Sequence, residues 1–381
     1  MPWQVRNRLP ILSPGLRCWP TNRLAADRSL SNAMPEFERP ELVRLQASPP
    51  HIFAAAYIDL PHPHFAGPRQ ELVFTLGITA VRGNMVLLGL AVNLLADHQI
   101  LSEQAWTAPM LQAHTGLPSL EIEEGTGLAI QHLYFNAPAY VRADSVLVTA
   151  VLTSANGETW NETLRIPVTF PQQSTDLRFP LRGNWWVIQG NDWRDLHKTE
   201  PVSQAFALDF VKLGSDNRFF GNTGANLEDH YSFGEPVYAP ASARVALTIW
   251  DMPDMAPGQV PDPAMMQGDA RRVLGNAVAL SHRRGEFSYL AHLQQGSVQV
   301  RVGDHIRRGT LLGYVGNSGH SPGPHLHYHL MNGPNLYTDQ ALPVQFGHVR
   351  ALGVEHRQPI TLTSGMIVSD IEPEQPPPEL G

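Results

Sequence analysis

The sequence is nearly free of cysteine. Cys18 is the single cysteine among 381 residues, which excludes internal disulfides and any metal cluster built on thiolates. The chain also lacks an excess of basic residues. Its formal net charge of −8 argues against nucleic acid as a partner, because phosphate binding needs a basic surface. The most apolar run, MVLLGLAVNLLA at residues 85–96, is shorter than the roughly 18 residues of a membrane span. We therefore expect no transmembrane span and interpret this run as a buried strand.

The two ends of the chain have the composition of disordered segments. Residues 1–34, within the segment 1–39, are rich in arginine and nearly free of acids, but they contain no uninterrupted apolar core and make a poor secretory signal. We predict a disordered leader there, with either Met1 or Met34 as the natural start. Residues 360–381 end in an acidic, proline-rich stretch, for which we predict a disordered tail.

Glycine and proline are abundant and lie between many short strand-like runs. Residues 40–170 contain runs of branched and aromatic residues separated by Gly, Asn and Pro. Within them, VLTSANGETWNETLRI predicts a hairpin that turns at Asn156 and Gly157. We predict an immunoglobulin-like β-sandwich over residues 40–170. A joint at residues 170–183 then leads to a second strand-rich region, so the whole chain is expected to be all-β.

Three histidines alternate in the segment SGHSPGPHLHYHL, residues 318–330. In a β-strand, His325, His327 and His329 would project from the same face. Neutral imidazole is a common metal ligand, so this row predicts a metal site. The alternative is a solvated edge strand with no chemical role.

A catalytic zinc site typically takes three nitrogen or oxygen ligands from the protein and leaves a fourth position for water. Asp209, in the apolar stretch QAFALDF, would be costly to bury unless it were paired or bound to a cation. It could equally be a strand-end residue that faces water. The candidate ligands in the second half of the chain are His197, Asp209, His230, His292, His325, His327 and His329.

The segments YLAHL, GSV, VGDHIRRG, GNSG and PHLH follow one another over residues 289–327. Together with GEPVYAPASARV upstream, they make residues 184–347 resemble the lysostaphin-type, LytM-like zinc metallopeptidases. These are peptidoglycan endopeptidases with the duplicated hybrid motif fold. The resemblance implies a β-domain with an open groove, which we place at residues 184–348.

The resemblance also implies a division of roles among the candidate residues. His327 and Asp209 would bind Zn²⁺, while His325 and His292 would orient the attacking water and stabilise the oxyanion. The family usually has a further histidine at the place of Ala205, and this sequence lacks it.

Another residue must then complete the site, or the site is degenerate. His197 is our preferred third zinc ligand, because a turn at Pro201 could fold it back over Asp209. His230, just before YSFGEPVYAP, is the second choice.

The resemblance predicts a zinc-dependent endopeptidase that hydrolyses stem or cross-bridge peptides of peptidoglycan by metal-activated water. Its partner would be the peptide substrate, and its location periplasmic or extracellular, although the leader does not resemble a signal. The alternative is a catalytically inactive LytM-like domain that binds cell-wall peptide or regulates a partner hydrolase. The absent histidine at position 205 favours this alternative, and the presence of Asp209, His292, His325 and His327 opposes it. The sequence does not predict an oligomeric state.

Overall fold

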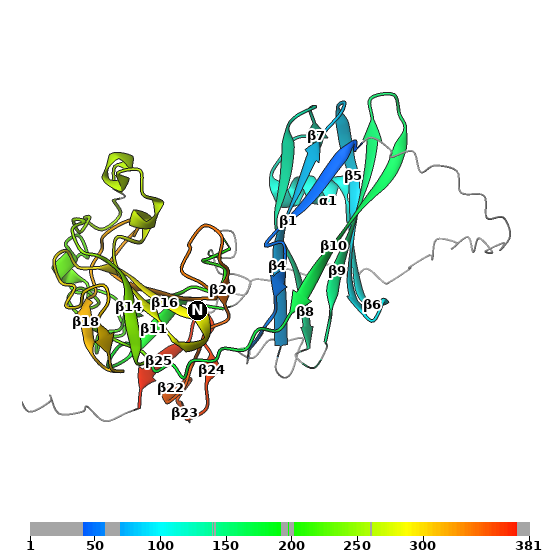
Figure 1. Cartoon of the computed structure of the whole chain (residues 1–381). Coiled ribbons are helices and arrows are strands. Elements are labelled where there is room, and N and C mark those ends of the chain that lie inside the picture. Colours follow the sequence, from blue (N-terminus) through cyan, green and yellow to red (C-terminus); the bar gives the residue numbers. More distant parts are fainter. Residues whose placement is uncertain are drawn as a thin grey trace, which may run out of the picture. The chain divides into compact units, whose positions relative to one another are not determined.

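A computed structural model of the chain describes residues 41–57, 69–138, 140, 142–191, 197, 202–259 and 261–371. The predicted leader therefore lies outside the described residues. Within them the regular structure is mostly strand, and α1 (Ala108–Thr115) is the one α-helix (Figure 1). The predicted all-β class is confirmed. None of the helices in this part of the chain has the length and apolarity needed to cross a bilayer.

The N-terminal half of the described chain consists of two sheets. One sheet contains β1 (Val43–Ser48), β4 (Arg69–Ala80), β3 (Ala55–Tyr57) and β8 (Gly127–Pro138). The other contains β2 (Ile52–Phe53), β10 (Thr159–Thr169), β9 (Ser145–Ser154), β5 (Met85–Ala96), β6 (Gln99–Thr107) and β7 (Glu121–Ile122). Alternate residues of both sheets share one apolar core, so the two sheets form a sandwich. Its immunoglobulin-like character stays a prediction.

Two local predictions for this half are confirmed. The apolar run at residues 85–96 is β5, a strand paired with β6 on one side and β9 on the other. β9 and β10 are antiparallel and are joined by a turn at Asn156 and Gly157. Gly157 has φ +82°, a backbone conformation that glycine adopts without steric strain.

The C-terminal half is built around one large sheet. In spatial order its strands are β17 (His305–Ile306), β14 (Ala243–Ile249), β15 (Asn276–Ser281), β16 (Phe287–Leu293), β19 (Leu326–Met331), β12 (Leu208–Lys212), β11 (Trp185–Gln189), β25 (Ile367–Asp370), β22 (Val349–Ala351) and β23 (Val354–His356). β20 (Ala341–Leu342) pairs with the end of β19. Two small sheets accompany it: β13 (Pro236–Tyr238) with β18 (Leu311–Tyr314), and β21 (Gln345–Phe346) with β24 (Ile360–Thr361). Short 3-10 turns are η2 (Leu227–Asp229), η3 (Pro263–Met266), η4 (Ala270–Leu274) and η5 (Arg283–Gly285).

The C-terminal end of this half differs from the sequence prediction. Residues 360–371 were expected in a disordered tail, but they include β24 and β25, and β25 pairs with β11 and β22 of the large sheet. Leu362, Met366 and Val368 are buried in the same core as the preceding strands. Their apolar side chains explain the difference, because the acidic and proline-rich composition begins only after them. Residues 372–381 lie outside the described residues.

β19 occupies the middle of the large sheet, between β16 and β12. Leu326, Tyr328 and Leu330 belong to the main apolar core, so the intervening histidines point to the opposite face. All six residues of the strand are buried. The alternative of a solvated edge strand is therefore wrong.

The turn of the β9–β10 hairpin leads to a prediction about the stability of the sandwich. In Gly157→Ala, the free energy of unfolding of the sandwich should fall by about 1 kcal/mol, because an L-residue is strained at this positive φ. The added methyl group itself would meet no atom within 4 Å, so the loss reports the backbone alone.

Urea unfolding followed by tryptophan fluorescence measures this effect. Gly77→Ala in β4 is the matched control, since its new methyl group would find its nearest neighbour at 3.8 Å and needs no positive φ. An equal loss in both variants would contradict the assigned turn.

Candidate metal centre and active site

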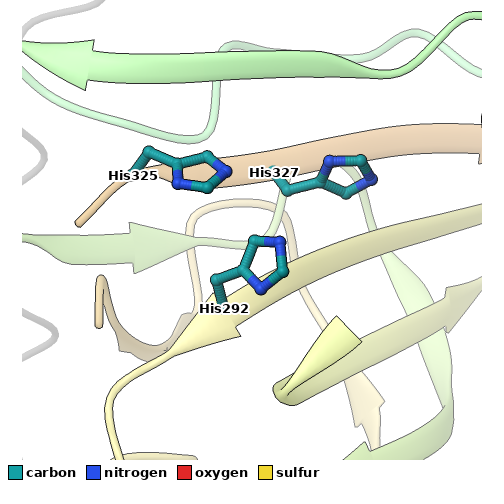
Figure 2. Close-up of side chains that lie close together, drawn as sticks. All are labelled: His292, His325 and His327. Carbon is teal, nitrogen blue, oxygen red and sulfur yellow. The ribbon is translucent and has the colours of Figure 1, made fainter. Parts of the chain in front are cut away.

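The side chains singled out in the sequence come together in two overlapping groups. In each group one nitrogen or carboxylate oxygen per residue lies within 4.8 Å of the others. One group consists of His197, Asp209 and His327, and the other of His292, His325 and His327. Figure 2 shows the rings of the second group close together, with His292 contributed by β16.

Strand register brings together the first two site residues, Asp209 and His327. β12 and β19 are antiparallel, with Asp209 directly opposite His327. His327 Nδ1 lies 2.9 Å from Asp209 Oδ1, within hydrogen-bond distance. Both residues are buried, with exposed fractions of 8% for Asp209 and 4% for His327. A buried carboxylate is thus held against an imidazole by the pairing of two central strands.

An unusual backbone conformation near the end of β16 orients the side chain of His292. Its φ of +58° is uncommon for a residue with a side chain. Its Nδ1–H donates to the carbonyl oxygen of Ser318 at 2.8 Å. Because a carbonyl can only accept, this bond places the ring proton on Nδ1 and leaves the lone pair of Nε2 for the site. The His292 ring centre lies 4.8 Å from that of His325 and 5.6 Å from that of His327.

The carbonyl that orients His292 is itself fixed by a buried polar cluster. Ser318 Oγ donates to Leu293 O at 2.7 Å and accepts the backbone N–H of Asn276 at 2.8 Å. The Asn276 side chain bonds both the N–H and the carbonyl of Met252. A methyl group on Gly275 would overlap the Ser318 backbone, so glycine permits this close approach. The segment GNSG was noted in the sequence, but nothing in it signalled this role for Ser318.

His325 is oriented in a similar way from the turn before β19. Its Nδ1–H donates to the carbonyl oxygen of Gly323 at 2.8 Å. Its Nε2 lies 3.5 Å from Asp209 Oδ1, and the side chain is only 5% exposed. His292 and His325 therefore both present Nε2 to the same region, each with its other ring nitrogen hydrogen-bonded to a carbonyl.

His197, the preferred third ligand, lies beside Asp209. His197 Nε2 lies 3.5 Å from Asp209 Oδ2, and its ring centre lies 5.0 Å from that of His327. Ala205, where the family has its histidine, packs in a small apolar cluster. His230, the second choice, contacts Gly224 O through Nε2 at 3.0 Å and belongs to neither group.

The third histidine of the row, His329, lies behind His327. Its Nδ1 is 3.0 Å from His327 Nε2, and its side chain is fully buried. Its ring is stacked on Tyr289, with centres 4.7 Å apart and planes 12° from parallel. The two-residue spacing predicted the shared face, but the contact with Tyr289 depends on the pairing of β16 with β19.

The electrostatics of the site centre on Asp209. Burial alone would raise the pKa of its carboxyl, but the nearby His325 and His197 and the hydrogen bonds from His325 and His327 hold that pKa well below its usual range. Asp209 in turn shifts the pKa of His325. Burial opposes its charged form, but Asp209 outweighs burial and raises the pKa of the His325 ring. Asp209 is therefore ionised at neutral pH.

The remaining imidazoles favour their neutral form. Burial and the neighbouring histidines lower the pKa of His327, and they lower the pKa values of His292 and His329 still further. Neutral imidazole is the form that binds a metal or accepts a proton.

Residues 222–339 match the model of a family described as peptidase family M23. This range contains His292, His325 and His327 and begins after His197 and Asp209. The resemblance predicted from the sequence is confirmed for this domain.

Two curated relatives are similar over short stretches. The DD-carboxypeptidase/endopeptidase Mpg of Neisseria meningitidis serogroup B is 43% identical over 54 residues, which are 14% of this chain and 12% of that protein. An uncharacterised metalloprotease of Buchnera aphidicola subsp. Baizongia pistaciae is 32% identical over 74 residues, 18% of this chain and 19% of that protein. The chain thus spans less than a fifth of the length of either relative.

Among solved structures, the catalytic domain of the antimicrobial peptidase lysostaphin from Staphylococcus simulans is 19% identical. The similarity covers 42% of this chain and 88% of that chain, with a TM-score of 0.24. A zinc-containing peptidase from Vibrio cholerae is 12% identical, covering 74% of this chain and 84% of that chain, with a TM-score of 0.25.

The histidine cluster predicts how the metal-free protein responds to acid. Three histidines of the cluster, together with the buried His282, have lowered pKa values, so below about pH 6.5 the unfolded chain binds more protons than the folded one. Stability present above pH 6.5 is therefore lost as the pH falls. His325, whose pKa is raised, acts in the opposite direction and offsets part of this loss. Chelator-treated protein should therefore have a lower free energy of unfolding at pH 5.5 than at pH 6.5, by at least about 1 kcal/mol.

Urea titrations at the two pH values measure this loss. His292→Gln removes one of the lowered groups and should reduce the loss by about 1 kcal/mol. A wild-type stability that stays constant over this interval would contradict the assigned protonation states.

Proposed function

We propose that the M23 domain makes this chain a zinc-dependent endopeptidase that hydrolyses stem or cross-bridge peptides of peptidoglycan. The observation that carries the proposal is the convergence of two groups on one residue. His327 belongs both to the set with Asp209 and His197 and to the set with His292 and His325. A metal-binding set and a pair of proton-transfer groups thus lie side by side.

The donor atoms fit zinc. Two imidazoles and one carboxylate form a three-ligand set of the kind that leaves a fourth position for water in catalytic zinc sites. Asp209 supports the assignment most directly, because a buried ionised carboxylate needs compensating positive charge. His327, Asp209 and His197 would hold the ion. When bound, zinc lowers the pKa of a coordinated water to about 7 and polarises a peptide carbonyl.

The two other histidines divide the proton transfers. His292 is held neutral with its proton on Nδ1, so its Nε2 lone pair can accept a proton from the attacking water and pass it to the leaving amine when the peptide C–N bond breaks. His325 has a raised pKa, so its Nε2 can hold a proton and donate a hydrogen bond to the developing oxyanion of the substrate. Their fixed Nδ1 contacts keep both Nε2 atoms directed at one region.

The substrate class rests on the relatives. The meningococcal relative is described as a DD-carboxypeptidase and endopeptidase, which supports a peptide with D-residues as the substrate of this chain. The histidine missing at position 205 remains the argument for a domain that binds such peptides without cutting them. The position of His197 beside Asp209 weakens that argument, because it offers an imidazole in place of the missing one.

Zinc content and activity test the division of roles. We expect about one zinc ion per chain in the wild type and a near-complete loss in His327→Ala, since His327 would be a ligand. His325→Ala should keep most of the zinc but lose peptide hydrolysis about 100-fold or more, since it would act on protons. Metal analysis and hydrolysis of purified peptidoglycan measure the two effects.

The outcomes separate the alternatives. Equal zinc loss in both variants would mean that both rings bind the metal. Zinc binding by the wild type without any hydrolysis would favour the non-catalytic peptide-binding domain.

His197 and His230 allow a matched comparison for the third ligand. His197→Ala should weaken zinc binding by at least about 10-fold, because it would leave two protein ligands where a catalytic zinc generally has three. His230→Ala removes a histidine that belongs to neither group and should leave zinc binding unchanged. Competition with a chromophoric chelator gives both dissociation constants. The reverse ranking would assign the third ligand to His230.

A further inference from the structure

We propose that His329 is a positioning residue that fixes the proton of His327 on Nε2 and thereby keeps Nδ1 available for the metal. The inference rests on the proposed zinc site. The observation behind it is the contact between His327 Nε2 and His329 Nδ1 at 3.0 Å, on the side of the ring away from Asp209.

The two contacts of the His327 ring decide which nitrogen can bind an ion. Nδ1 faces Asp209 Oδ1 at 2.9 Å and so belongs to the group with Asp209 and His197. A nitrogen that binds a metal must offer a lone pair, so the neutral ring must then carry its proton on Nε2. That N–H points at His329, whose Nδ1 can accept it when the His329 proton is on Nε2.

Without a metal, the same pair can hold its protons the other way round. His327 Nδ1–H then donates to Asp209, and His327 Nε2 accepts from His329 Nδ1–H. Each ring keeps one proton in both arrangements. His329 can therefore follow His327 between its metal-free and metal-bound tautomers, because one imidazole nitrogen serves as donor or acceptor.

The surroundings of His329 favour this role over simple packing. Its ring is stacked on Tyr289, whose hydroxyl donates to Pro334 O at 2.6 Å, so the ring plane is fixed. Its Nε2 is buried without a hydrogen-bond partner among the described residues. An apolar side chain would fill this space without burying such an atom. The gain that offsets this cost is the Nδ1 contact with His327.

Three variants test the inference by zinc affinity, measured by chelator competition in the full chain. His329→Leu removes the acceptor and should weaken zinc binding about 10–100-fold, the usual cost of losing the partner of a metal-binding histidine. His329→Asn keeps a polar atom close to the position of Nδ1 and should restore most of the affinity. His282→Leu is the control. His282 is a buried histidine of the same domain that contacts Ser288 instead, so its loss should leave zinc affinity unchanged.

The outcomes distinguish this inference from the proposed function. A wild type that binds no zinc overturns both. A wild type that binds zinc, with His329→Leu binding it equally well or His329→Asn binding it as poorly as His329→Leu, overturns the inference alone. If His329→Leu does not fold, nitrogen-15 NMR of the zinc-loaded wild type decides the matter. A proton on His327 Nε2 supports the role, and a proton on His329 Nδ1 overturns it.

Discussion

The buried charge of Asp209 is the constraint on which the rest of the site depends. An ionised carboxylate with an exposed fraction of only 8% is stable only where positive or hydrogen-bonding groups surround it. Among the described residues, three imidazoles serve in this way: His327 across the strand pair, His325 from the preceding turn and His197 from the segment before β12. Histidine suits this task because a ring N–H can donate a hydrogen bond to the carboxylate, and the same nitrogen in the other tautomer can bind a metal ion. The arrangement that stabilises the carboxylate therefore also prepares a cation site.

The scaffold separates this polar cluster from the apolar core by strand alternation. One face of β19 contributes Leu326, Tyr328 and Leu330 to the core, so the other face can carry histidines at no cost to packing. The neighbouring strands hold the site rigidly, since β19 is paired along both edges. A site on central strands is placed more accurately than one on a loop. His325 and His197 lie outside these strands, and His292, although in β16, needs a positive φ and the Ser318 carbonyl to reach the others.

Local patterns in the sequence predicted much of this arrangement, and non-local pairing explains what they missed. Alternation placed His325, His327 and His329 on one face, whereas the apolar stretch around Asp209 left open whether its carboxylate is buried or faces water. The hairpin at Asn156 and Gly157 and the strand at residues 85–96 followed from turn chemistry and composition. By contrast, β24 and β25 gain their stability from partners that are distant in the sequence. The roles of Ser318 and of the stacked pair Tyr289 and His329 depend on such partners as well.

The absent histidine at position 205 shows how a site can differ from a sequence motif and still bring an imidazole to the same carboxylate. A metal requires donor atoms at suitable points in space, and the sequence position of each donor matters only through the backbone that delivers it. Ala205 packs among apolar side chains, while His197 reaches the same carboxylate from eight residues further upstream in the chain. The absence of the histidine at position 205 therefore does not by itself show that this chain is inactive. The number of imidazoles near Asp209 is a better indicator of metal binding, because their nitrogens are the ligands available to an ion.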